Sequence, residues 1–197
     1  GPGPYTEKLL DILDRYNVKA TFFVTNGKPD YQNLIAQEAQ RGHTVAIHSA
    51  SHDYAKIYQS VDAYFADFDE MNSIITAQTG KAADLVRFPG GSSNTISKKY
   101  CYGIMSQLVC AVEERGFRYC DWNVSSGDAG GTTSTSQVAA NVIAGIKGNN
   151  VSVVLQHDIK NFSVDAVEQI IQWGLSEGYT FLPIISTTPM SHHGVNN

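Results

Sequence analysis

The sequence has few cysteines, and their spacing builds no covalent or metal-binding framework. Cys101, Cys110 and Cys120 are the only three among 197 residues, and no C-x-x-C pair occurs. This excludes a disulfide scaffold and a zinc knuckle. Free, buried thiols are the expected state, because cysteine is among the residue types most often found inside a protein.

Long apolar runs and an excess of positive charge are also missing. No stretch approaches the roughly 18 apolar residues of a membrane-spanning helix, and no secretory leader is evident in these residues. The formal net charge is −5, from 14 basic and 19 acidic residues. A face that binds nucleic acid is basic, so this balance argues against such a partner. The remaining composition, 42% hydrophobic and 17% charged residues, is typical of a globular domain.

Apolar periodicity alternates between helix and strand along the whole chain. Strands that alternate with helices pair in parallel and are covered by those helices, so we expect one α/β domain over residues 1–197. Thr6 is a candidate N-cap of the first helix, and Gly80 ends the longest one. Helices are predicted over residues 7–16, 31–41, 57–79, 98–115, 136–147 and 164–177, and strands over residues 20–24, 44–48, 85–88, 117–123, 151–156 and 180–185.

The chain enters its first helix directly after Gly1-Pro2-Gly3-Pro4. In a parallel α/β fold a helix normally crosses over from a preceding strand, so these residues look like a strand-to-helix loop. The pattern therefore predicts a first strand that precedes Gly1. A native start at the helix is the alternative.

Two histidines lie at the end of the predicted strand at residues 44–48 and just beyond it. His48 and His52 are four residues apart, a spacing that lets both imidazoles reach one divalent metal ion. Active sites in such folds usually lie at the carboxyl ends of the strands. Taken alone, the pair is equally well explained by chance, and a catalytic metal would need a third ligand, a carboxylate or another histidine.

Single polar residues end three further strands. Arg87 precedes a glycine-rich turn and can orient a carboxylate through its donor fork. Asp121 is followed by Trp122, an apolar wall suited to the face of a sugar, and a Ser/Gly/Thr-rich stretch at residues 125–135 is predicted as a functional loop. His157 can act as a general acid if a carboxylate holds it protonated. Each residue alone has an ordinary structural explanation, but their shared position, with the two histidines, predicts metal-assisted hydrolysis.

The motifs, taken in order, resemble those of the NodB-type polysaccharide deacetylases, carbohydrate esterase family 4. The resemblance runs from GPGPYTEKLLDIL and KATFFV through HSASH, RFPGGSSN, DWN and LQHD to the tail TPMSHHGVNN. It is strongest to Firmicute peptidoglycan N-acetylglucosamine deacetylases. It implies a distorted (β/α) barrel of seven strands and hydrolysis of a glycan N-acetyl group with release of acetate. Relatives that act on chitin or xylan share the motifs, so those substrates stay open.

The resemblance also implies roles for individual residues. A divalent metal, usually zinc with Co²⁺ or Ni²⁺ as alternatives, would be held by His48, His52 and an aspartate. Arg87 would orient the catalytic base, and Asp121 would pair with the catalytic acid His157. The substrate-binding residues it implies are Trp122, Leu155, Pro89 and Gly90.

One departure from the family pattern is large. The family's first motif, T-F-D-D, supplies the base and the third metal ligand immediately before G-P-G-P, and this chain begins at that glycine. The resemblance implies that the first strand and both carboxylates lie upstream, so residues 1–197 alone should be nearly inactive and bind metal weakly. A glycan-binding protein without activity is the alternative. We expect a monomer that acts on a glycan outside a bacterial cell or in its envelope.

Overall fold

The strands of the protein form two parallel sheets. The computed structural model describes all residues from 1 to 197. Every strand pairing in it is parallel, which confirms the α/β class expected from the alternation of helices and strands. The larger sheet has the order β1 (Thr21–Thr25), β2 (Thr44–Ser49), β3 (Leu85–Val86) and β4 (Arg118–Tyr119), and the smaller sheet pairs β5 (Val124–Ser125) with β6 (Val154–Leu155).

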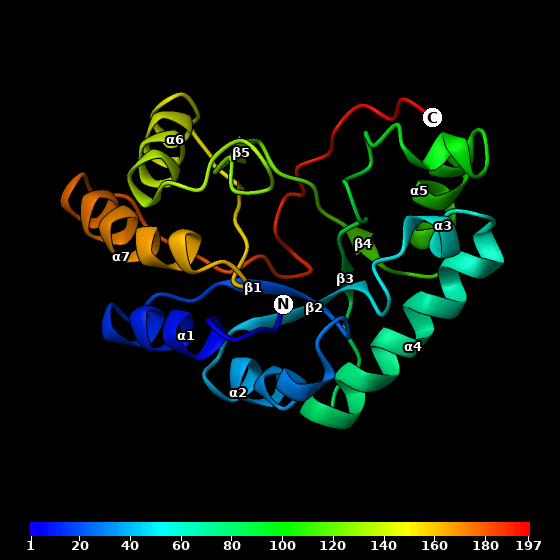
Figure 1. Ribbon diagram of the computed structural model, residues 1–197, viewed down its shortest axis with the longest axis horizontal. Helices are drawn as coiled ribbons and strands as arrows, with labels where there is room; N and C mark the ends of the chain where they lie inside the picture. Colours follow the sequence, from blue (N-terminus) through cyan, green and yellow to red (C-terminus); the bar gives the residue numbers. More distant parts are fainter.

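The helices lie around the outside of the strands (Figure 1). They are α1 (Thr6–Arg15), α2 (Leu34–Gln40), α3 (Tyr54–Ile57), α4 (Val61–Thr79), α5 (Ile104–Glu114), α6 (Thr135–Lys147) and α7 (Asn161–Ser176), with short 3-10 turns at Pro29–Tyr31 and Ser97–Lys99. Helices α2 and α4 contact β2 of the larger sheet, whereas α6 contacts β5 of the smaller sheet and packs on α7. Helix α1 contacts both α2 and α7, and it therefore connects the helices of the two sheets.

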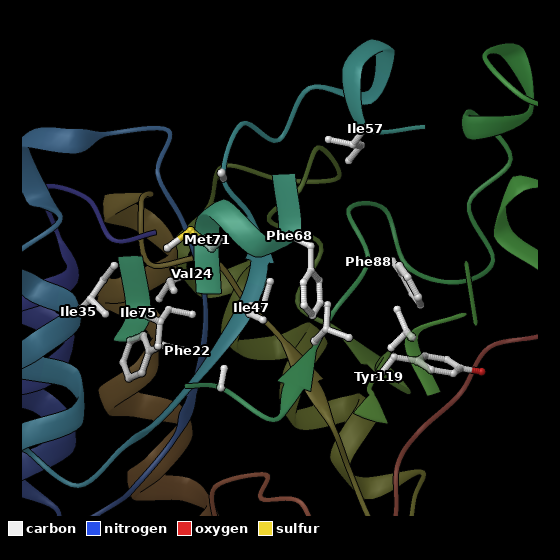
Figure 2. Packing of buried hydrophobic residues seen from close by; sticks show 14 of the residues in the cluster. Phe22, Val24, Ile35, Ile47, Ile57, Phe68, Met71, Ile75, Phe88 and Tyr119 are labelled. Carbon is white, nitrogen blue, oxygen red and sulfur yellow. The ribbon is translucent and has the colours of Figure 1, made fainter. Parts of the chain in front are cut away.

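The main hydrophobic core lies between the larger sheet and its helices. It contains 26 buried residues. Figure 2 shows Met71 and Ile75 of α4 beside Val24 of β1, and Phe68 of the same helix beside Ile47 of β2. Each such side chain contributes about 1.5–3 kcal/mol when it is fully buried. The carboxyl ends of β1 and β2 are thus fixed by a well-packed layer.

Three predicted helices begin later than expected. The helix predicted over 31–41 starts at Leu34, as α2. The helix predicted over 57–79 begins only at Val61, as α4, because Ser60 has an extended backbone and its hydroxyl caps α4. The separate short helix α3 ends at Ile57. The helix predicted over 98–115 starts only after Gly103, whose φ of 76° lies in the left-handed region. Gly80 ends α4 in the same left-handed conformation, as predicted.

The prediction that Thr6 caps the first helix is wrong. Tyr5 occupies the cap position without a side-chain hydrogen bond, and Thr6 is the first residue of α1. The Thr6 hydroxyl accepts a hydrogen bond from the Gly3 amide at 2.8 Å and donates one to Asp158. Thr6 therefore links the start of α1 to the loop after β6.

The strand predicted over 117–123 is much shorter in the structure. The Cys120 amide still donates to the Val86 carbonyl at 2.9 Å, but the Asp121 amide donates at 2.7 Å to Ser191 in the C-terminal tail. The chain thus leaves the larger sheet at Asp121. It joins the smaller sheet as β5 three residues later.

The strand predicted over 151–156 is reduced to the two residues of β6. The side-chain amide of Asn123 donates to the Val151 carbonyl at 2.8 Å, and its oxygen accepts from the Val153 amide at 2.7 Å. A side chain therefore satisfies backbone groups that a strand ladder would otherwise pair.

The prediction of a last strand over 180–185 is wrong, because no strand forms there. The segment is attached to β1 through a side chain. The Thr21 hydroxyl accepts from the Ile184 amide at 2.7 Å and donates to the Ile184 carbonyl at 2.9 Å. These two bonds replace a backbone ladder.

The cysteines are free, as predicted, but only Cys120 is buried. Cys101 is half-buried and Cys110 is exposed, so the expectation of three buried thiols is wrong. Cys110 lies on α5, whose buried face is formed by Ile104, Leu108 and Val112. No helix of the protein combines the length and apolar character that crossing a membrane requires.

Candidate active site

A cavity of about 840 Å³ lies between β1 of the larger sheet and β6 of the smaller one. The residues around it come from segments far apart in the sequence, and most of the predicted site residues are among them. Asp121 and Pro89 are not. The predicted site residues that line the cavity are His48, His52, Arg87, Gly90, Trp122, Leu155 and His157.

His48, near the end of β2, and His52, just after the strand, lie close together. The ring centroids of His48 and His52 are 5.0 Å apart. The Nδ1 atom of His48 is 2.6 Å from the carbonyl oxygen of Arg87. Because a carbonyl oxygen only accepts, Nδ1 carries the proton and the Nε2 lone pair of His48 stays free. The two imidazole rings are therefore close enough for one nitrogen of each to bind the same metal ion.

Asp67 of α4 holds the turn that carries these histidines. Its buried carboxylate accepts hydrogen bonds from the Ser49 hydroxyl at 2.5 Å and the Ala50 amide at 2.8 Å. It also accepts from the amide and hydroxyl of Ser51, at 2.8 and 2.5 Å. His52 follows with φ of 53°, a left-handed backbone that is uncommon outside glycine. A carboxylate that accepts four hydrogen bonds thus fixes an unfavourable local conformation.

Both imidazoles are neutral at ordinary pH. Burial lowers the pKa of His48 well below its usual value, and the neighbouring His52 lowers it further. Burial also lowers the pKa of His52. Neutral imidazole is the form that binds a metal ion.

Arg87 is buried and bonded to backbone rather than to a carboxylate. Its Nε donates to the Cys120 carbonyl at 2.8 Å, and a terminal nitrogen donates to the Asp121 carbonyl at 2.9 Å. The guanidinium also lies 4.2 Å from the centre of the Phe23 ring, a cation–π contact. Arg87 therefore joins β3 to the segment after β4 and presents its charge to the cavity wall.

The prediction that Asp121 pairs with His157 is contradicted by the hydrogen bonds of both residues. The Asp121 carboxylate is fully buried, and it accepts from the amide and hydroxyl of Ser92 at 2.8 and 2.5 Å. It also accepts from the His193 amide at 2.9 Å. Asp121 thus fastens the glycine-rich turn to the C-terminal tail.

Asp128 is the carboxylate that holds His157. Its Oδ1 lies 2.8 Å from His157 Nδ1, and its Oδ2 accepts from the His157 amide at 2.7 Å and the Ser163 hydroxyl at 2.6 Å. Burial opposes the charged form, but the hydrogen bonds from His157 and Ser163 outweigh it and lower the pKa of Asp128 to about 2. An ionised Asp128 fixes the proton of His157 on Nδ1 and leaves Nε2 directed away from the pair.

A signal for Asp128 is present in the sequence. It is the only charged residue between positions 125 and 135. Such a residue in a polar loop at a strand end is a functional candidate. The sequence does not reveal that the partner of Asp128 is His157, because their contact depends on how β5 pairs with β6.

The predicted substrate-binding residues divide into two groups. Trp122 and Leu155 line the cavity with Gly90. Pro89 is buried instead, and its carbonyl accepts a hydrogen bond from the Tyr58 hydroxyl at 2.6 Å. Pro89 therefore supports the turn from behind.

The chain offers two metal ligands, and no group of three or more His, Cys, Asp or Glu side chains is arranged to hold a metal ion. The two neutral imidazoles fit a metal that prefers nitrogen ligands, but a catalytic zinc site usually has three protein ligands. The two histidines within residues 1–197 are therefore the right type of ligand for such a metal, but a third protein ligand is missing from these residues.

This chain belongs to the polysaccharide deacetylase family, whose sequence model matches residues 1–102. Members of this family are hydrolases. The chain is 32% identical over 187 residues to a peptidoglycan-N-acetylglucosamine deacetylase of Bacillus cereus, with 92% of this chain and 65% of that protein covered. It thus spans a little under two thirds of that relative's length.

Solved structures of related proteins share the whole fold. One is the catalytic domain of a peptidoglycan N-acetylglucosamine deacetylase from Eubacterium rectale, 69% identical, with a TM-score of 0.99, and the comparison covers 100% of this chain and 90% of that one. Another is the polysaccharide deacetylase Bc1974 from Bacillus cereus, 31% identical, with a TM-score of 0.84 over 98% of this chain and 91% of that one. The polysaccharide deacetylase fold that the motifs implied is confirmed.

Proposed function

We propose that this chain is the larger part of a hydrolase that removes the N-acetyl group from glycans, with peptidoglycan N-acetylglucosamine as the substrate. The single observation that carries the proposal is the meeting of His48, His52, Arg87 and His157 around one cavity. The names of the relatives support the substrate class. Chitin and acetylated xylan are the alternative substrates, and a relative of this chain is a bifunctional xylanase/deacetylase.

A divalent metal is part of the proposal. His48 and His52 would hold it through their free imidazole nitrogens, and zinc suits this ligand type, with Co²⁺ or Ni²⁺ as alternatives. Such an ion supplies Lewis acidity toward the acetyl carbonyl. The lowered pKa of both imidazoles, which keeps them neutral, supports the assignment.

His157 would act as the general acid. Asp128 Oδ1 lies 2.8 Å from Nδ1 of His157 and holds a proton on that nitrogen. A protonated Nε2 on the opposite side of the ring can then donate to the departing sugar nitrogen. Arg87 places a positive charge in the cavity wall, where it can orient a carboxylate that acts as base. Trp122 and Leu155 would enclose the apolar methyl of the acetyl group.

A segment N-terminal to Gly1 would complete the domain. The Gly1 carbonyl accepts from the Thr25 amide at 2.7 Å, at the carboxyl end of β1. A strand that ends at Gly1 would therefore run parallel to β1, and α1 would be the crossover between the two, which is the usual connection in such a sheet. This segment would supply the base and the third metal ligand. The cell envelope or the extracellular space of a bacterium, and a monomeric state, are parts of the same proposal.

Acetate release by the natural full-length protein tests the function. We expect release from an N-acetylglucosamine oligomer that stops on chelation and returns with zinc. His157→Ala should lower the rate on the order of 10²–10⁴-fold, and Asn196→Ala, in the exposed end of the tail, should leave it unchanged. Residues 1–197 alone should be nearly inactive. An undiminished rate after His157→Ala would remove the mechanism.

A glycan-binding role without catalysis is the second candidate. It rests on the absence of a third ligand within residues 1–197. Oligosaccharide binding without acetate release, in a full-length protein that lacks two carboxylates upstream of Gly1, would favour it.

A further inference from the structure

Tyr54 lies in the cavity but belongs to none of the motifs considered so far. It is the first residue of α3, two positions after His52, and its half-buried side chain lines the cavity. Its ring centroid is 5.7 Å from that of His52 and 5.4 Å from that of Tyr58. Tyr54 is therefore a neighbour of the candidate metal ligands.

The glycine-rich turn makes room for the Tyr54 hydroxyl. A methyl group at Gly90 would lie 2.6 Å from that oxygen, and a methyl group at Gly91 would lie 2.9 Å from the Trp122 ring. Real Cβ atoms do not approach other atoms so closely. Both glycines have φ near 80°, which other residues rarely adopt. The turn thus lies between Tyr54 and Trp122, and these two aromatic side chains bound the cavity on either side of it.

The hydroxyls of Tyr54 and Tyr58 differ in their partners. The Tyr58 hydroxyl is fully buried and donates to the Pro89 carbonyl at 2.6 Å. The Tyr54 hydroxyl has no hydrogen-bond partner within the protein and lies beside Gly90, which lines the cavity together with Tyr54. A phenol is protonated at neutral pH and usually finds an acceptor when it is partly buried. Its acceptor is therefore to be sought among the molecules that enter the cavity.

We propose that Tyr54 contacts the substrate: its hydroxyl donates a hydrogen bond to an oxygen of the N-acetylated sugar bound beside His52. Tyr54 and Trp122 together then set the width of the binding groove at the Gly90–Gly91 turn. This inference rests on the proposed deacetylase function for the identity of the sugar. Tyr54, the hydrogen-bond donor in this proposal, is not part of the family motifs in this sequence.

Tyr54→Phe in the natural full-length protein is the test, because it removes only the hydroxyl. We expect the KM for an N-acetylglucosamine oligomer to rise about 3- to 10-fold, as for one lost hydrogen bond, while kcat changes less than about twofold. Zinc content and the unfolding temperature should stay at the wild-type values. Tyr102→Phe, at a side chain on a residue that is 86% exposed, is the matched control and should change nothing.

Tyr58→Phe provides the signature of a purely structural tyrosine, a lower unfolding temperature from the loss of the bond to Pro89. An unchanged KM in Tyr54→Phe, or a KM change accompanied by that signature, overturns the proposal. If the wild type releases no acetate, the proposed function fails, but titration with the oligomer still decides the role of Tyr54. Binding that is about 3- to 10-fold weaker in Tyr54→Phe supports the contact, and equal binding refutes it.

Discussion

The proton position on His157 depends on one carboxylate. Asp128 contacts both the ring and the backbone amide of His157, at 2.8 and 2.7 Å. The second bond fixes the backbone as well as the ring, so the imidazole has little freedom to turn. Asp128 is buried, with 1% of its surface exposed, and solvent therefore screens this pair only weakly.

Asp128→Asn should reduce both stability and activity. The pKa of Asp128 falls from 3.8 to about 2 on folding, so its charged form stabilises the fold by about 2 kcal/mol at neutral pH. Because the folded pKa is the lower one, this contribution is present above about pH 4 and is lost as the pH falls through 2. The substitution should therefore lower the unfolding free energy strongly at pH 7 and only slightly at pH 2. An equal effect at both pH values would contradict the assigned charge.

At the scale of single elements, helix α4 positions the turn between the two candidate metal ligands. Its buried face packs on the sheet through residues such as Phe68 and Met71, and Asp67, directly before Phe68, binds the turn of residues 49–51. The core therefore positions the carboxylate, and the carboxylate positions the two histidines. Because Asp67 is on the same helix as these core residues, the packing of α4 also fixes the geometry of the candidate metal ligands.

Asp67→Asn should lower the unfolding free energy by about 1–3 kcal/mol, because an amide cannot accept all the hydrogen bonds of the carboxylate. It should also weaken zinc binding by the full-length protein, since the turn that carries His48 and His52 loses its support. Chemical denaturation and zinc titration measure the two effects. Asp69→Asn is the matched control on the same helix, because Asp69 is exposed and pairs only with Arg115, and it should cost less than about 1 kcal/mol.

At the scale of the whole molecule, the cavity lies in the space between the two sheets. One wall is β1 with α1, and the other is β6 with α7. Glu38 of α2 lines this space, is fully buried, and forms no hydrogen bond through either carboxylate oxygen. Burial, and secondarily the charge of Asp158, raise the pKa of Glu38 well above its usual value.

Glu38→Met should stabilise the 197-residue chain. The raised pKa means that Glu38 weakens the fold progressively as the pH rises above about 4.5. The gain from removing a buried, unpaired carboxyl should be about 1–3 kcal/mol at pH 7 and smaller at pH 4. Unfolding curves at the two pH values measure it, with Glu177→Met at an exposed position as control. A loss of stability at pH 7 would show that the carboxyl has a partner.

Much of the fold and part of the candidate site follow from the sequence. The spacing of His48 and His52 after a strand placed both imidazoles on the cavity, because four residues of a turn suffice to bring them together. The helices were recognisable from their periodicity. The short strands were not, since the side chains of Asn123 and Thr21 take over backbone hydrogen bonds that the local pattern assigns to a ladder.

The sequence by itself determined the alternation of helices and strands, the ends of the helices at glycine and the identity of the groups available for chemistry, because each of these depends on neighbours within a few residues. Only the tertiary structure decided which carboxylate meets His157. Asp121 and Asp128 differ by seven positions, but Asp121 is bound by Ser92 and His193, whereas the pairing of Ser125 with Leu155 brings Asp128 to the histidine. Contacts between residues so distant in sequence depend on how separate strands pair, and no local pattern records that pairing.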